Sequence, residues 1–76
     1  MAHFTPRAEK RDAQGSLVVL YTDDHAAWFV GRKGDPSLDP HPMGAFRSEE
    51  AAKNWADHKF DGGSWGAPGS APAKSP

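Results

Sequence analysis

The stretches Leu17-Val-Val-Leu-Tyr-Thr22 and Ala27-Trp-Phe-Val-Gly-Arg-Lys33 decide the fold of this chain. Both are rich in β-branched and aromatic residues and have the length of a strand, and the polar residues 23–26 between them favour a turn. We therefore predict an antiparallel hairpin. With residues 23–26 as the loop, Thr22 lies opposite Ala27, and the remaining pairs follow by counting outward.

In this register both faces of the hairpin are apolar. One face carries Leu17, Val19, Tyr21, Trp28, Val30 and Arg32, and the other carries Val18, Leu20, Phe29 and Gly31. A face exposed to solvent normally shows polar alternation, so this pattern predicts that both faces are covered. One helix covers only one face. The second face is covered either from within, by Phe4, Trp65 or the N-terminal arm, or by another protein or a second copy.

The segment after the hairpin predicts a short third strand and then a helix. Met43–Arg47 is the strand candidate, and Ser48 is a favourable N-cap for a helix that begins at Glu49 and ends before Gly62-Gly63. Glu49 and Lys53 form a favourable i,i+4 pair. The apolar stripe of this helix consists of Ala52, Trp55, Ala56 and Phe60.

Composition divides the chain into three parts. Residues 1–15 read as a flexible arm or at most one short edge strand, and residues 62–76 as a disordered tail of Gly, Pro, Ser and Ala. Residues 16–61 form the folded unit, in which the three prolines of residues 34–42 stiffen a surface loop. The predicted class is α+β: a two- or three-stranded antiparallel sheet, ββ(β)α, with one C-terminal helix packed on one face.

Charge and cysteine content restrict the function. The 76 residues include no cysteine, which excludes disulfides and thiolate metal sites and fits a cytoplasmic location. Nine basic and ten acidic residues give a formal charge of −1, so no global positive field attracts nucleic acid. The longest apolar run, residues 17–21, is too short to span a membrane, and residues 1–12 lack the apolar core of a signal peptide.

Clusters of polar residues do not form a recognisable catalytic or metal site. His25 follows Asp23 and Asp24 in a turn, where polar residues serve the backbone. A second loose cluster comprises Asp35, Asp39 and His41, and a third comprises His58 and Asp61 at the helix end, where a histidine suits the dipole. The serines have turn or cap roles, and no glycine-rich phosphate loop precedes the helix. We expect no enzyme, no cofactor and no bound metal.

The segment Gly44-Ala-Phe-Arg-Ser-Glu-Glu-Ala-Ala-Lys-Asn-Trp55 resembles the strand-to-helix passage of small ββα and βββα domains of phage and bacterial proteins. These include the arm-type DNA-binding domains of phage integrases. The resemblance covers about a dozen residues. It implies an architecture more than an activity, because one fold serves many functions.

These observations lead to a non-enzymatic protein-binding module, of the kind found among phage or mobile-element accessory and inhibitor proteins. It would dock on a larger partner or dimerise. The expected binding residues are Tyr21, Trp28, Val30, Arg32, Lys33 and Arg47. The alternative, ranked second, is a nucleic-acid-binding module in which Arg32, Lys33 and Arg47 contact phosphates and Tyr21 and Trp28 stack on bases.

Overall fold

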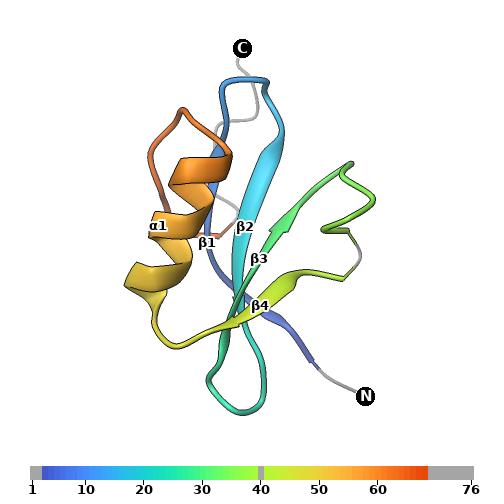
Figure 1. Ribbon diagram of the computed structural model, residues 1–76, viewed down its shortest axis with the longest axis vertical. Coiled ribbons are helices and arrows are strands. Elements are labelled where there is room, and N and C mark those ends of the chain that lie inside the picture. Colours follow the sequence, from blue (N-terminus) through green and yellow to red (C-terminus); the bar gives the residue numbers. More distant parts are fainter. Residues whose placement is uncertain (1–2, 40, 69–76) are drawn as a thin grey trace.

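The computed structural model describes residues 3–39 and 41–68 and contains one antiparallel sheet and one helix. The strands lie side by side in chain order (Figure 1): β1 (Thr5–Arg11), β2 (Leu17–Thr22), β3 (Trp28–Arg32) and β4 (Met43–Phe46). The helix α1 (Glu49–Lys59) crosses one face of the sheet. The predicted α+β class is confirmed, and the sheet has four strands rather than two or three.

The additional strand is β1, an edge strand within residues 1–15, for which the sequence predicts a flexible arm or at most one short edge strand. Its sequence, Thr-Pro-Arg-Ala-Glu-Lys-Arg, has few of the residues that favour strands, so local propensity does not reveal it. Pairing with β2 supplies its hydrogen bonds, and it buries Ala8 to 5% exposure and Lys10 to 2%. The edge position of β1 fits its charged composition, since sheet edges commonly carry charge.

The predicted register of the β2–β3 hairpin is wrong by one residue. Thr22 lies opposite Trp28, not Ala27, and Leu20 lies opposite Val30. The difference arises in the turn, where the Asp23 carboxylate accepts hydrogen bonds from the N–H groups of His25 and Ala27. The loop is therefore Asp23–Ala27, one residue longer at its C-terminal end than predicted. A slip of one residue moves every side chain of β3 to the opposite face relative to β2.

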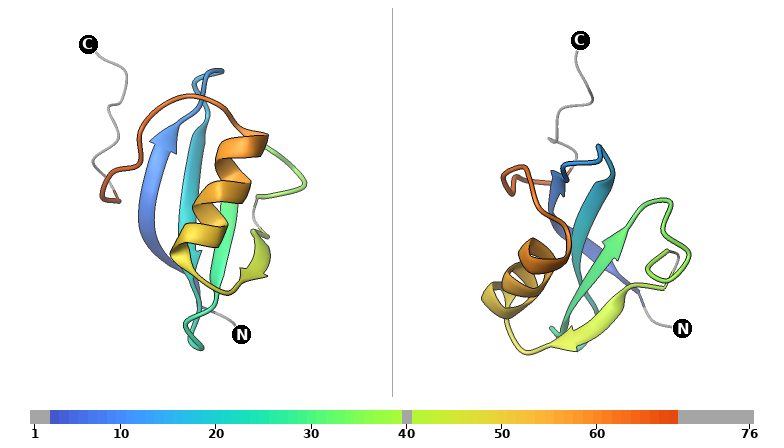
Figure 2. Two further views of the ribbon diagram at one scale, coloured as in Figure 1. Left: turned by 60° about the vertical axis from the view of Figure 1, so that its left-hand side comes forward. Right: turned by 45° about the horizontal axis from the view of Figure 1, so that its top comes forward.

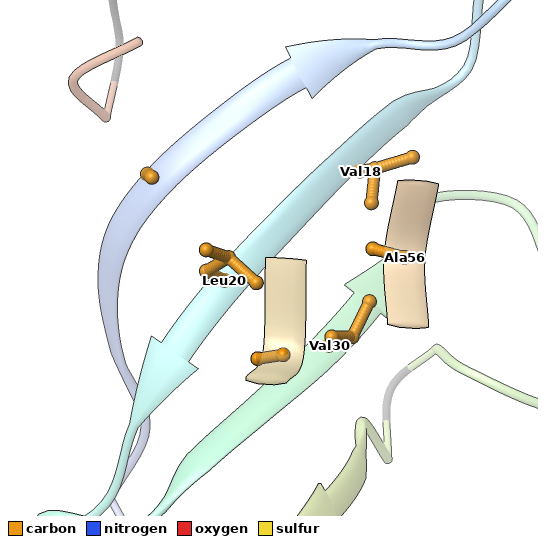
Figure 3. Packing of buried hydrophobic residues seen from close by; sticks show 6 residues of the cluster. Val18, Leu20, Val30 and Ala56 are labelled. Carbon is orange, nitrogen blue, oxygen red and sulfur yellow. The ribbon is translucent and has the colours of Figure 1, made fainter. Parts of the chain in front are cut away.

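The corrected register places the core between the sheet and α1. Val18, Leu20 and Val30 are fully buried and pack with Ala52 and Ala56 of the helix. Figure 3 labels Val18, Leu20, Val30 and Ala56 in this contact. Larger apolar side chains border this centre: Trp28, Phe46, Trp55, Phe60 and Trp65. Small alanines at the contact let the helix approach the sheet closely, and the aromatic rings seal the margins.

The limits of α1 agree closely with those that the sequence predicts. The Ser48 hydroxyl accepts a hydrogen bond from the N–H of Ala51, so Ser48 is the N-cap. The ammonium of Lys53 lies 3.0 Å from the Glu49 carboxylate. Trp55 is only half-buried, against Phe46 on one side and Phe60 on the other. The predicted stripe is correct, but its alanines form the centre and its aromatic residues the border.

Residues 62–68 follow the outer edge of β1 instead of leaving the domain (Figure 2). Glu9 and Gly66 exchange two backbone hydrogen bonds of 2.9 Å, and the N–H of Ala13 donates to the Asp61 carbonyl at 2.7 Å. We call residues 62–68 the strap. The prediction of a disordered tail is therefore corrected for the strap, and its remaining part, residues 69–76, lies outside the described residues.

Candidate binding site on the open face

The sheet surface opposite α1 has no second layer of secondary structure among the described residues (Figure 2). We call it the open face. Strand pairing arranges its side chains in three rows across the sheet. The aromatic row contains Pro6, Tyr21, Phe29 and Gly44; the central row contains Glu9, Val19 and Gly31; the cation row contains Arg11, Leu17 and Lys33.

Phe4, Tyr21 and Phe29 form a cluster at the aromatic end of the open face. The ring centroid of Phe4 lies 5.0 Å from that of Phe29 and 6.1 Å from that of Tyr21, both in edge-to-face geometry. All three side chains are half-buried. Edge-to-face pairs are favourable beyond the area they bury, so this cluster holds its shape without a covering layer.

Two glycines allow these rings to lie flat against the sheet. A Cβ atom on Gly31 would approach the Tyr21 ring to 2.9 Å, and a Cβ atom on Gly44 would overlap the Phe29 ring. Each ring therefore occupies the space above a glycine of the neighbouring strand. The result is a low surface of aromatic rings rather than a ridge of upright side chains.

The cation row lies at the other end of the open face. The N–H of Lys33 donates to the Leu17 carbonyl at 2.9 Å, which continues the β2–β3 register and sets Lys33 opposite Leu17. Arg11 is opposite Leu17 on the β1 side. The Lys33 side chain is exposed. The Arg11 guanidinium donates through Nη1 to the Gly15 carbonyl, and its Nε is buried without a hydrogen-bond partner.

The residues between the two rows do not project from the surface. Val19 is 3% exposed and Gly31 has no side chain. The loop that follows β3 lies over this region, because the Leu38 carbonyl and the Pro42 side chain are within 4 Å of the space above Gly31 and Leu38 is itself only 4% exposed. The centre of the open face is thus covered by the chain's own loop, and the exposed part of the face is at its two ends.

The structure divides the six expected binding residues among different surfaces. Tyr21 and Lys33 lie on the open face, at opposite ends. Trp28, Val30 and Arg32 lie on the helix side, a consequence of the one-residue slip in register. Arg47 is exposed between β4 and α1. The predicted grouping of Tyr21, Trp28 and Val30 on an uncovered face is therefore wrong for Trp28 and Val30.

Arg32 is committed to the fold. Its Nε donates to the Asp12 carboxylate at 2.9 Å, one Nη donates to Gln14 at 2.8 Å, and the guanidinium lies 4.9 Å from the Phe60 ring centroid. Partial burial raises the pKa of Asp12, but hydrogen bonds from the Ser16 N–H and the Arg32 side chain outweigh it and hold that pKa below its usual range. Arg32 therefore has little capacity left for a phosphate.

Lys10 fastens the strap and the helix to β1. Its buried ammonium donates at 2.8 Å to the Asp57 carboxylate and at 2.8 Å to the Phe60 carbonyl at the C-cap of α1. The Trp65 ring centroid lies 5.2 Å from the same ammonium, and the Trp65 indole N–H donates to Asp57 at 3.0 Å. Trp65 thus covers the β1 edge on the helix side and does not cover the open face. Of the expected internal covers, it is Phe4 that contacts the rings of the open face.

The described residues contain no group of three His, Asp or Glu side chains that could hold a metal ion. The Asp23 carboxylate is engaged by backbone N–H groups, and the bond from Ser37 lowers the pKa of Asp35. These acidic side chains organise loops. In the described part of the chain, no helix is long and apolar enough to cross a membrane.

Sequence reasoning named Phe4 as a possible cover of the second face, but it missed Arg11 and placed Phe29 on the face opposite to Tyr21. Phe29 was misplaced by the register, whereas Phe4 and Arg11 were assigned to an arm. The alternation of the apolar Phe4 and Pro6 with the polar Thr5, which lies opposite Thr22, is a local signal for Phe4.

No family model, curated protein or solved structure matches this chain.

Proposed function

We propose that this protein is a non-enzymatic binding module that docks on another protein through its open face. The observation that carries the proposal is the cluster of Phe4, Tyr21 and Phe29 on a sheet surface without a second layer. Aromatic residues and arginine are enriched where protein interfaces are buried. A protein partner would complete the burial of these rings, each of which retains partial exposure, unlike the fully buried Leu20 and Val30.

The aromatic cluster is well suited to docking because it is preorganised. Gly31 and Gly44 hold the Tyr21 and Phe29 rings flat, and Phe4 braces both rings from the edge. Rings that are already fixed lose little conformational freedom when a partner covers them. Small size and the resemblance of residues 44–55 to phage and bacterial domains support a role as an accessory or inhibitor protein of a phage or mobile element.

Binding of single-stranded nucleic acid is the second candidate, because Arg11 and Lys33 share the open face with the aromatic rings. Stacking platforms beside cations are the usual means of binding single strands. Two features favour a protein instead: the formal charge of −1, and the position of Glu9 between the two rows. At about 0.15 M salt we therefore expect no sub-micromolar affinity for DNA or RNA.

A photo-reactive phenylalanine analogue at position 21, in the cells that make the protein, tests the proposal. Irradiation should join this position to a protein, whereas the same analogue at position 54, on the exposed side of α1, should give no adduct. Adducts to nucleic acid alone at position 21 would favour the second candidate.

A stability comparison provides the matched control. Tyr21→Ser should change the free energy of unfolding much less than Val30→Ser, which places a hydroxyl in the core. If both variants unfolded equally and position 21 gave no adduct, the cluster would be an internal second core and the proposal would be wrong.

A further inference from the structure

We infer that a groove between α1 and the segment leading into β4 binds a short acidic segment of a partner protein. An aliphatic side chain of that segment fills the groove, and a neighbouring carboxylate pairs with Lys59. The groove is lined by Leu38, Met43, Trp55, Lys59 and Phe60, together with Asp35 and Ser37. It lies on the helix side of the sheet, because Met43 is opposite Val30, which packs against α1. The inference therefore concerns a second surface and does not rest on the open face.

Met43 marks the groove as an incomplete apolar contact. It is the one large hydrophobic side chain that the described residues leave exposed, at 44%. Trp55 and Phe60, which line the same groove, are themselves half-buried. A single methionine on a surface needs no explanation, but one that shares a hollow with two aromatic side chains forms apolar surface that a partner can cover. Methionine also adapts its shape to the side chain it meets.

The size of the groove suits one side chain of a partner. Its volume is about 180 Å³, whereas pockets for cofactors and other small molecules usually measure about 300–1,000 Å³. The Trp55 ring is held between Phe46 and Phe60, at centroid distances of 5.5 and 6.2 Å. This wall is formed before any partner arrives, so little conformational freedom is lost on binding.

Lys59 gives the groove an unpaired positive charge. Its ammonium lies 5.8 Å from the Trp55 ring centroid and forms no ion pair with a carboxylate of the described residues. Asp35, the other charged residue of the groove, already accepts hydrogen bonds from Ser37 and lies 3.5 Å from the Arg32 guanidinium. A carboxylate beside an aliphatic side chain therefore complements the groove better than an apolar segment alone.

Amide NMR spectra of the full chain, recorded during titration with capped tetrapeptides, test the inference. The probe is acetyl-Gly-Leu-Glu-Gly-amide, and two matched peptides replace its leucine by alanine or its glutamate by glutamine. The probe should bind at millimolar concentration or below and shift the amides of Met43 and Phe60 and the indole N–H of Trp55, but not the amide of Val19. The glutamine peptide should bind about fivefold more weakly and the alanine peptide about tenfold more weakly, because they lose the ion pair and the buried apolar area respectively.

Variants of the chain assign each contact. Lys59→Gln should bind the glutamate and glutamine peptides equally but keep the preference for leucine over alanine. Met43→Ser should bind all three peptides more weakly. Lys53→Gln removes a lysine of the same helix that does not line the groove, so it should leave all three affinities unchanged. Circular dichroism checks that the variants are folded; if Met43→Ser is not, the result with Lys59→Gln still decides.

The inference is wrong if the probe shifts neither Met43 nor Trp55 at millimolar concentration. It is equally wrong if the wild type does not distinguish glutamate from glutamine or leucine from alanine. Shifts of the same groups that grow with protein concentration alone would also overturn it, because a second copy of the chain would then cover the groove. None of these results bears on the open face, which adduct formation at position 21 tests separately.

Discussion

Asp12 holds the turn between β1 and β2 to the end of β3. Its carboxylate accepts hydrogen bonds from the N–H groups of Gln14 and Ser16 and from the Arg32 side chain. These bonds favour the charged form and lower the pKa of Asp12 in the folded protein despite its burial. A native pKa below the unfolded one means that the unfolded chain binds more protons in acid, so the stability from Asp12 is lost as pH falls.

The first prediction concerns this residue. Asp12→Asn should lower the free energy of unfolding at pH 7 by about 1–3 kcal/mol. The Arg32 guanidinium loses its charged partner, and an NH2 group, which cannot accept a hydrogen bond, replaces one carboxylate oxygen. The difference between wild type and variant should be constant above about pH 5 and should shrink as pH falls below about 4, through the lowered native pKa. Urea unfolding at several pH values measures it. A difference that does not change with pH would contradict the assigned role.

At the scale of elements, the distance between α1 and the sheet depends on alanines. Ala52 and Ala56 have no exposed surface and face Val18, Leu20 and Val30. The aromatic side chains of the helix stripe, Trp55 and Phe60, lie beside this contact rather than in it. A helix that packs through alanine has no free volume at its centre, since protein interiors are close-packed.

The second prediction follows from this packing. Ala56→Leu should lower the free energy of unfolding by about 1–3 kcal/mol, because the larger side chain pushes the helix from the sheet. Asn54→Leu, on the exposed side of the same helix, should change it by about 0.5 kcal/mol or less. Thermal denaturation compares the two. Equal effects at both positions would show that the helix contacts the sheet through a different side.

The strap depends on two glycines with positive φ. A Cβ atom on Gly63 would overlap the Arg11 carbonyl, and one on Gly62 would approach the Ala13 nitrogen to 2.7 Å. The third prediction is that Gly63→Ala detaches the strap from β1, since both the conformation and the contact oppose a side chain. Hydrogen exchange at the Glu9 amide, which donates to Gly66, should become faster. The amide of Leu20, in the central strand, should be unaffected.

At the scale of the whole molecule, the folded unit extends from β1 to the strap. Lys10 connects three parts of the chain, because its ammonium contacts Asp57 of α1, the Phe60 carbonyl and the Trp65 ring. A buried lysine requires partners, and here they come from the helix, its C-cap residue and the strap. The strap therefore completes the environment of Lys10.

The fourth prediction compares two truncated chains. A chain that ends at residue 68 should keep the thermal midpoint of the full chain, because residues 69–76 consist mainly of Gly, Ser, Ala and Pro. A chain that ends at residue 61 should lose about 2 kcal/mol, because it loses the Trp65 contacts and the backbone bonds of Gly66. Similar midpoints for both chains would show that the strap adds nothing to stability.

The sequence by itself determined the features that arise from local interactions. The strands β2 and β3, the short strand β4, the N-cap at Ser48 and the apolar stripe of α1 follow from propensity, periodicity and capping, which act between residues close in the chain. Both faces of the hairpin were also recognisable as apolar. These predictions hold because each depends on a segment of only a few residues.

Only the tertiary structure decided which side chains share a face. The Asp23 turn lengthens the loop by one residue, and this alone transfers Trp28 and Val30 to the helix side and brings Tyr21 and Phe29 together. The strand β1 and the strap exist because β2 and β1 offer backbone partners, which no local pattern in residues 5–11 or 62–68 reveals. The physical reason is that a strand has a period of two, so a single-residue change in a loop reverses every side chain beyond it.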